Sequence, residues 1–519
     1  MSKKEQFTAA IQKSYQTDKP VIHLGSAILD GEIISEARVS LPLRMMNRHG
    51  LVAGATGSGK TRTLQVFAEQ LSAAGVPVFM SDIKGDLSGI AQPGKSNAAL
   101  EERSQILGNV FTPKGYPVEL YSLSGKKGSQ MRATILEFGP ILLSKIFGLN
   151  DTQAGVLAIL FKYADDQDLP MVDLNDLKKV LNYLSEGPGA AEIKGDYGSI
   201  SSSTAGTILR KIVALEQQGV GSIFGERSFD INDLIDRVDG QGIISLLNIS
   251  DVQDKPALFS TFMLSLLAEL YQKLPEAGDL DKPKLVFFLD EAHLLFKDAP
   301  KAFLDQIEQV IRLIRSKGVG VFFCTQMAQD VPVSVLSQLG NRVQHVLRAF
   351  TPQDADALKQ TVKTYPKSSF YEIDQVLTTL GIGQALITVL NEKGIPTEVA
   401  ATHLLPPTSI MGPMVQADYD QHVQQSSLYQ KYKDPVDPES AYEMLTKRME
   451  AHAKADEPTR QETTEVRKQK EEKGMLSEAL NSPLAKQIGR EVVRGVFGML
   501  FGKTTRSRST KKGGGLFGF

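Results

Sequence analysis

A glycine-rich segment at residues 54–61 has the residue types and spacing of a phosphate-binding loop. It reads Gly54, Ala55, Thr56, Gly57, Ser58, Gly59, Lys60 and Thr61, which fits the Walker A pattern. In such a loop, backbone N–H groups surround a β-phosphate, the lysine reaches the β- and γ-phosphates, and the last hydroxyl binds Mg²⁺. An apolar run (49–53) precedes it and an amphipathic stretch (64–74) follows, which argues against a chance glycine-rich turn. We therefore predict that this segment binds ATP and Mg²⁺.

Two carboxylates follow a second apolar run farther along the chain. Residues 285–289 are all apolar, which is typical of a strand buried on both faces of a sheet, and Asp290 and Glu291 come next. Open α/β sheets bind ligands at the carboxyl ends of their strands. We expect Asp290 to hold Mg²⁺ through water and Glu291 to polarise the attacking water, which predicts hydrolysis. The competing interpretation is a strand that ends in a helix cap.

Three further polar side chains are candidates for the same reaction. Gln326 follows the apolar run 319–324 and would sense the γ-phosphate or orient water, although a plain polar strand end also explains it. Arg312 and Arg315 lie near the end of an amphipathic stretch, 303–317. Each is either a complement to the helix dipole or an arginine finger that completes the ATP site of a neighbouring subunit.

Other polar residues give weaker indications. Asp82 and Lys84 follow the apolar stretch 76–81, and for them a contact with Mg²⁺ or phosphate and a structural role are equally open. The histidines show no ligand spacing, and Cys324 is the only cysteine. A cysteine-based metal cluster and an internal disulfide are therefore excluded, and Mg²⁺ bound with the nucleotide is the only metal we expect.

The order of the expected elements predicts an α/β fold. Strand, helix and strand at 49–53, 64–74 and 76–81 form a βαβ unit, which predicts a mostly parallel sheet covered on both faces. Further strands are expected at 242–248, 285–289, 319–325, 343–347 and 384–390. We predict an N-terminal segment with a hairpin (1–45), an ATPase core (46–90 and 240–410), a mostly helical insertion (91–239), a polar and charged linker (411–475) and a basic tail with a short helix (476–519).

Composition favours a soluble protein of the cytoplasm. Hydrophobic residues make up 41% of the chain and charged residues 23%, which are ordinary values for a globular protein. No run approaches the roughly 20 apolar residues of a membrane-spanning helix. The net charge of -2 hides a basic tail, because residues 482–519 hold eight Lys or Arg residues and a single acidic residue, Glu491. Such a tail suits nucleic acid, a membrane surface or packing on its own core.

Four motifs follow one another along residues 20–410: GATGSGKT, LVFFLDEAH, IRLIRSKGVGVFFCTQ and QLGNRVQHVLRAF. Together they resemble the HerA/FtsK superfamily of P-loop ATPases, in the bacterial branch of HerA-like helicases. The resemblance implies a RecA-like P-loop core, ATP hydrolysis, a homo-oligomeric ring of six subunits and translocation of DNA. By position it assigns nucleotide and Mg²⁺ binding to Lys60 and Thr61, the Walker B pair to Asp290 and Glu291, the sensor to Gln326, and the finger in trans to Arg315, with Arg312 in reserve.

The sequence departs from this family in three places. The N-terminal segment is too short for the β-barrel of archaeal HerA, Met327 stands where translocases often carry Arg-Pro or Asn-Pro, and Gln384 stands where relatives have Glu. The chain before residue 482 is also acidic, whereas motors that track phosphates need basic side chains facing the strand. Two alternatives to a DNA translocase therefore stay open: an ATPase that remodels or moves protein, and a nucleotide-dependent switch.

Overall fold

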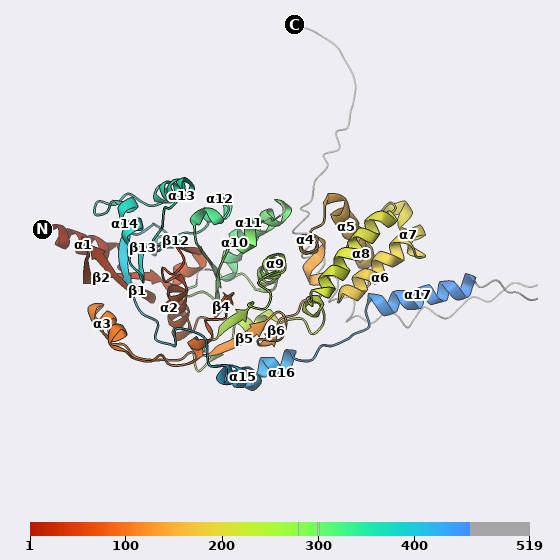
Figure 1. Cartoon of the computed structure of the whole chain (residues 1–519), viewed down its shortest axis with the longest axis horizontal. Coiled ribbons are helices and arrows are strands. Elements are labelled where there is room, and N and C mark those ends of the chain that lie inside the picture. The colour runs from red at the N-terminus through yellow and green to blue at the C-terminus, as the bar shows by residue number, and fades with distance from the viewer. Residues whose placement is uncertain (279, 298, 300, 457–519) are drawn as a thin grey trace, which may run out of the picture.

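A twelve-stranded sheet forms the centre of the computed structural model, which describes residues 1–278, 280–297, 299 and 301–456 (Figure 1). Its strands are β1 (Val21–Leu29), β2 (Glu32–Pro42), β3 (Gly50–Ala53), β4 (Val78–Asp82), β5 (Val118–Ser122), β6 (Ser129–Gln130), β9 (Ile244–Asn248), β10 (Leu285–Leu289), β11 (Val319–Thr325), β12 (Asn341–Gln344), β13 (Gln384–Thr388) and β14 (Ala400–Leu404). They follow the order β2-β1-β14-β13-β12-β3-β11-β10-β4-β9-β5-β6. Neighbours run parallel from β12 to β6 and antiparallel from β2 to β12.

Helices cover both faces of this sheet, because its central strands are apolar on both sides. β3, β10 and β11 are buried along their whole length. Phe288 shares one hydrophobic core with α1 (Lys3–Tyr15) and α2 (Lys60–Ala73). Its neighbour Phe287 points to the other face and shares a second core with α9 (Pro256–Lys273) and α11 (Lys301–Ile314). The prediction of a mostly parallel α/β sheet covered on both sides is confirmed.

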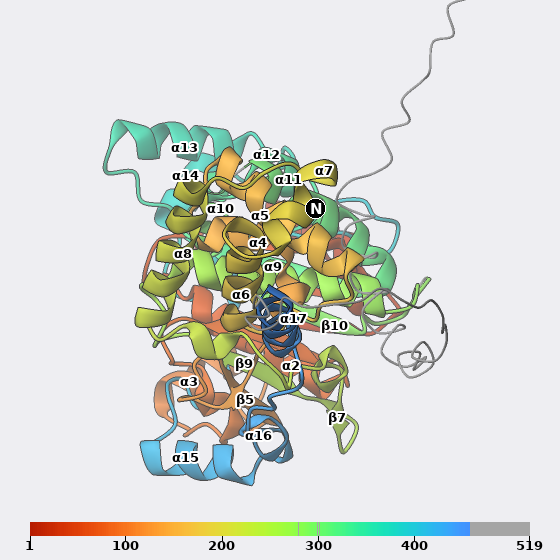
Figure 2. The same cartoon turned by 90° about the vertical axis from the view of Figure 1, so that its right-hand side faces the viewer.

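A helical lobe forms one end of the molecule and faces the viewer in Figure 2. It contains α4 (Ile135–Ile146), α5 (Asp151–Asp166), α6 (Leu174–Ser185), α7 (Gly189–Asp196) and α8 (Ser202–Gln217). The lobe begins later than the insertion predicted at 91–239, because β5 and β6 within that range belong to the main sheet. β5 has the sequence VELYS, in which polar residues interrupt the continuous apolar run that marks the central strands. The helix α3 (Ala98–Ile106) precedes it, and a separate hairpin, β7 (Arg237–Val238) and β8 (Gln241–Gly242), follows the lobe.

The folded structure continues beyond residue 410. It adds α15 (Gln416–Gln425), α16 (Ser427–Tyr432) and α17 (Ala441–Asp456), and α17 packs against α6 of the lobe (Figure 2). Tyr432 and Leu445 are completely buried, and Ser440 donates a hydrogen bond of 2.5 Å to Asp176. The prediction of a linker over 411–475 is therefore wrong for this part, because a few isolated apolar anchors gave no helical period. The predicted tail lies outside the described residues.

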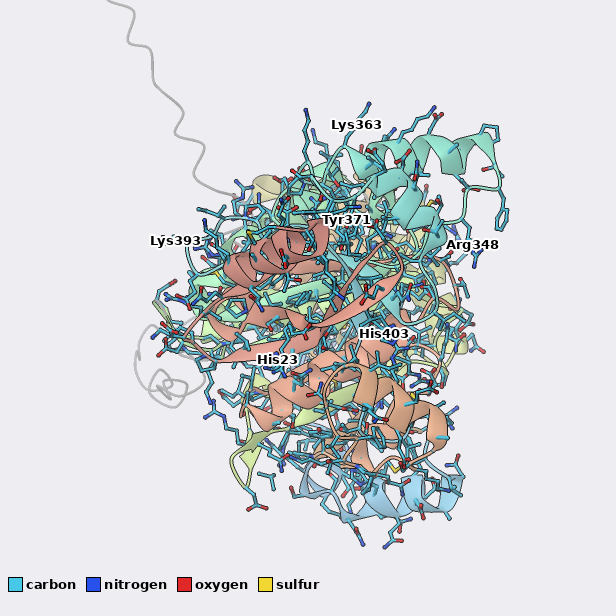
Figure 3. All side chains as sticks on the ribbon, turned by 90° about the vertical axis from the view of Figure 1, so that its left-hand side faces the viewer. His23, Arg348, Lys363, Tyr371, Lys393 and His403 are labelled. Atoms are coloured by element: carbon cyan, nitrogen blue, oxygen red, sulfur yellow. The ribbon has the colours of Figure 1, made fainter. Side chains whose placement is uncertain are left out.

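The predicted N-terminal hairpin is confirmed and extends the main sheet. β1 pairs antiparallel with β2 and with β14, so His23 of β1 and His403 of β14 come from adjacent strands in Figure 3. The helix α1 packs on β2 and on the turn at Phe370 and Tyr371. Across the described ranges, no helix is long and apolar enough to cross a membrane.

Candidate active site

The glycine-rich loop joins the end of β3 to the start of α2. Gly57 and Gly59 have φ angles of 77° and 108°, left-handed conformations that glycine adopts without steric cost. The loop therefore turns tightly and leads directly into a helix N-terminus. Lys60 Nζ donates to the carbonyl oxygens of Gly54 at 2.7 Å and Ala55 at 3.2 Å, so the ammonium lies over the loop itself.

Two neighbouring strands hold the start of this loop in place. The Gly54 N–H is 3.2 Å from the Thr325 carbonyl oxygen and 3.1 Å from that of Gln326, at the end of β11. The Ala55 N–H donates to the Val346 carbonyl, after β12, at 2.9 Å. Because all three strands run parallel, their carboxyl ends meet at this edge of the sheet, which we call the nucleotide edge.

The two carboxylates after β10 lie at the same edge. Asp290 is 8% exposed, its N–H donates to Ser81 Oγ on β4 at 2.9 Å, and its Oδ1 accepts from the Glu291 N–H at 2.9 Å. Glu291 has a φ of 49°, an uncommon value for a non-glycine residue. Its Oε2 is buried without a hydrogen-bond partner in the described part of the chain, and His293 Nδ1 lies 3.4 Å away. A carboxylate oxygen in this state is available to accept a proton from water.

The strand order places Gln326 at the nucleotide edge, together with the glycine-rich loop and the two carboxylates. It follows β11, which lies between β3 of the glycine-rich loop and β10 of the carboxylates. Its side chain is exposed, whereas the preceding Thr325 is buried and donates to Asp330 Oδ2 at 2.5 Å. Asp330 also accepts from the Met327 N–H at 3.0 Å. The strand end is thus fixed, and the exposed amide lies next to both halves of the site.

Asp82, which ends β4, has a structural role in this conformation. Its carboxylate accepts backbone N–H groups from Gly85 at 2.8 Å, Asp86 at 3.1 Å and Leu87 at 3.1 Å, and so closes the loop after the strand. Burial raises the pKa of Asp82 to about 6. Lys84 in the same loop is exposed. Of the two roles that the sequence left open for Asp82, these contacts favour the structural one.

His345 supports the glycine-rich loop, a role that the sequence did not reveal. It follows β12 and is completely buried, with Nε2 3.0 Å from the Thr63 hydroxyl of α2. A Cβ atom added to Gly54 would lie 2.5 Å from His345 Cβ, so position 54 has no room for a side chain. Burial lowers the pKa of His345 to about 4, which keeps the ring neutral at physiological pH. Histidine spacing could not find it, because its observed contacts are with Thr63 and the backbone at Gly54 rather than with other histidines.

Arg312 and Arg315 lie at the opposite edge of the sheet. Arg312 is near the end of α11, where its Nη2 is 3.2 Å from a Glu308 carboxylate oxygen, and Arg315 stands just before β11 begins. Both line a pocket in which basic side chains outnumber acidic ones. Its charged residues are Arg44, Arg48, Arg312, Arg315, Lys393, Glu276 and Glu392. This basic pocket and the nucleotide edge are separated by the length of the parallel strands. In Figure 3, Lys393 of the pocket and Arg348, which follows the carboxyl end of β12, lie at opposite sides of the molecule.

Comparison with known proteins shows which family the chain belongs to. The family described as helicase HerA-like C-terminal matches residues 29–506. The chain belongs to this family. This HerA-like protein is a P-loop ATPase with a RecA-like core, as its motifs predict.

Two archaeal proteins are similar in sequence to this HerA-like ATPase. It is 22% identical over 391 residues to the DNA double-strand break repair helicase HerA of Sulfolobus acidocaldarius, a match that covers 71% of this chain and 67% of the relative. It is 23% identical over 378 residues to the protein of the same name from Sulfurisphaera tokodaii, covering 69% and 66%. The matches span about two thirds of the length of these relatives.

Solved structures share the fold of this HerA-like ATPase. The bacterial conjugative coupling protein TrwBdeltaN70 superposes with a TM-score of 0.50 at 13% identity, covering 78% of this chain and 93% of that chain. The plasmid coupling protein TrwB in complex with the GTP analogue GDPNP also has a TM-score of 0.50, at 12% identity, covering 78% and 94%. At this identity the likeness establishes the fold.

Proposed function

We propose that this HerA-like ATPase uses ATP hydrolysis to move along DNA, as a homo-oligomeric ring of six copies. The observation that carries the proposal is the order of three strands, in which β11 lies between β3 and β10. A phosphate in loop 54–61 is then bordered on one side by Gln326, Asp290 and Glu291, the groups that hydrolysis requires. Support for DNA comes from the two archaeal relatives, which are named as DNA repair helicases.

Each group in this site has a proposed role. Residues 54–60 hold the phosphates through backbone N–H groups and the Lys60 ammonium, which moves from the loop carbonyls to the nucleotide. Thr61 and Asp290 hold Mg²⁺, whose charge offsets that of the phosphates. Glu291 accepts a proton from the attacking water, and Gln326 orients that water or senses the γ-phosphate. We assign the protein to the cytoplasm, since its single cysteine cannot form an internal disulfide.

The ring is proposed because the basic pocket and the nucleotide edge lie at opposite ends of the same strands. Arg315 precedes β11 and Gln326 follows it, so Arg315 is directed away from the phosphates of its own subunit. Packing the basic pocket of one copy over the nucleotide edge of the next brings Arg315 to the γ-phosphate, where its positive charge stabilises the transition state. Arg312 is the reserve candidate for this role, since it is already beside Glu308.

ATPase rates with and without single- and double-stranded DNA test the proposed function. We expect DNA to stimulate turnover severalfold and Glu291→Gln to abolish turnover in both conditions. Glu186→Gln, an exposed carboxylate of the helical lobe, is the matched control and should leave both rates unchanged. Fast turnover that DNA does not alter would favour an ATPase that acts on protein, and slow turnover without stimulation would favour a switch.

A further inference from the structure

A tight turn at residues 381–384 presents an exposed isoleucine beside the glycine-rich loop. The Gln384 N–H donates to the Gly381 carbonyl at 3.1 Å, and the Gly381 N–H donates to Gln384 Oε1 at 2.8 Å. Gly383 has a φ of 71°, as the third residue of a type II turn requires. Ile382 is therefore the first central residue of the turn, and its side chain is 79% exposed.

This turn is attached directly to the glycine-rich loop. The Gly383 N–H donates to the Ser58 carbonyl at 3.2 Å, and a Cβ atom on Gly59 would lie 3.3 Å from Gly383 N. Arg103 of α3 also holds the turn in place. Its Nη2 donates to the Gly383 carbonyl at 2.5 Å, and its Nε donates to the Leu404 carbonyl at 2.8 Å. The position of Ile382 relative to the phosphate loop is thus set by hydrogen bonds on two sides.

The sheet order fixes the direction in which a bound nucleotide extends. The γ-phosphate belongs on the side of β11 and β10, because Gln326 and Glu291 follow those strands. The α-phosphate and nucleoside must then leave the loop on the opposite side, toward β12 and β13. The turn 381–384 precedes β13 and lies on that side, and Figure 1 shows α14 (Ile373–Thr379) and α10 (His293–Phe296) on either side of α2.

We propose that Ile382 is the wall on which the nucleoside of the bound nucleotide rests, an inference that builds on the ATP site proposed above. An exposed aliphatic side chain matches the apolar face of a purine base. An aliphatic side chain does not distinguish the hydrogen-bonding edges of the bases, and the N–H groups of Gly381, Gly383 and Gln384 are already bonded within the turn or to the loop. The wall therefore adds affinity for adenine and guanine nucleotides alike.

Binding of Mg-ADP, Mg-GDP and Mg-tripolyphosphate to Ile382→Ala tests this assignment by calorimetry. The substitution should weaken binding of both nucleotides on the order of fivefold and leave tripolyphosphate unchanged, because only the nucleosides contact position 382. Ile395→Ala is the matched control. Ile395 is 55% exposed in the turn after β13, at the opposite edge of the sheet, and its loss should change none of the three affinities.

Two other results would overturn the assignment of Ile382, and a third would refute the ATP site itself. Unchanged nucleotide affinity in Ile382→Ala would overturn the assignment while leaving the ATP site intact. Equal weakening of tripolyphosphate and nucleotides would also overturn it, because the turn would then act only by supporting the loop. If the natural protein binds neither nucleotides nor tripolyphosphate, the ATP site itself is refuted, and this outcome is distinct from the first two.

Discussion

The substitution Lys145→Met would remove a buried amine that joins the helical lobe to the ATPase core. Lys145 is 7% exposed, and its Nζ donates to Ser260 Oγ at 2.7 Å and to the Leu295 carbonyl at 3.2 Å. The same Nζ also lies 3.5 Å from the ring centre of Phe303. Leu295 belongs to α10, just after the carboxylates of the site. Burial lowers the pKa of Lys145 from 10.5 to about 7.

This lowered pKa links stability to pH. The unfolded chain keeps the Lys145 proton up to pH 10.5, whereas the folded protein releases it near pH 7. The stability that the neutral amine contributes is therefore present above pH 10.5 and is lost as the pH falls toward 7. Between pH 9.5 and 7 the loss is about 3 kcal/mol, at about 1.4 kcal/mol for each pH unit. Methionine keeps the side-chain length without the charge, and it gives up hydrogen bonds worth about 1 kcal/mol each.

Urea unfolding followed by circular dichroism measures this effect. We expect Lys145→Met to be slightly less stable than the natural protein at about pH 9.5 and more stable at about pH 7, so that the difference in unfolding free energy shifts by about 3 kcal/mol. Glu137, whose pKa burial raises to about 7, titrates in both proteins and cancels in this difference. If the free energies of the two proteins run parallel across this pH range, the reasoning is refuted.

Three further predictions concern the ATP site, the ring and the tail. Lys60→Ala should bind ATP at least about tenfold more weakly, whereas Glu291→Gln should keep its affinity and lose turnover; equal loss of binding of a fluorescent ATP analogue would contradict these roles. Arg315→Ala should lower the ATPase rate with little change in affinity, and mixing it with Lys60→Ala should restore activity at mixed interfaces, whereas a fully active monomer would exclude the mechanism. Deleting residues 482–519 should keep basal ATPase activity within a few-fold and weaken DNA binding in a salt-dependent way, since eight basic residues are lost. Unchanged DNA affinity at low salt would show that the tail serves packing or assembly instead.

The parts of the fold that could be predicted are those encoded by short local patterns. Five consecutive apolar residues, 285–289, form β10, and the run 319–325 forms β11 over the predicted range. Such runs are informative because a strand in a parallel sheet is buried on both faces. The segment 411–456 was missed for the opposite reason. Tyr419, Tyr432 and Leu445 are buried single anchors, and their polar neighbours hide any period.

The hydrogen bonds that hold the site residues in place could not be predicted, because they join residues far apart in the chain. Ser81 and Asp290 are 209 residues apart and are 2.9 Å apart in space, and Thr63 and His345 are separated by 282 residues. Only the strand order brings these pairs together. Sequence patterns therefore predict candidate residues for the chemistry, whereas the structure adds which residues hold those candidates in place.

In the proposed ring, the strand β11 connects two ATP sites, that of its own subunit and that of the adjacent subunit. It is buried at all seven positions and hydrogen-bonded on both sides, so it behaves as a stiff rod roughly 23 Å long. Gln326 follows one end and Arg315 lies just before the other. A displacement of Gln326 when the γ-phosphate leaves would therefore be transmitted along the strand to the arginine that serves the adjacent subunit. Subunits coupled in this way would hydrolyse ATP in succession around the ring.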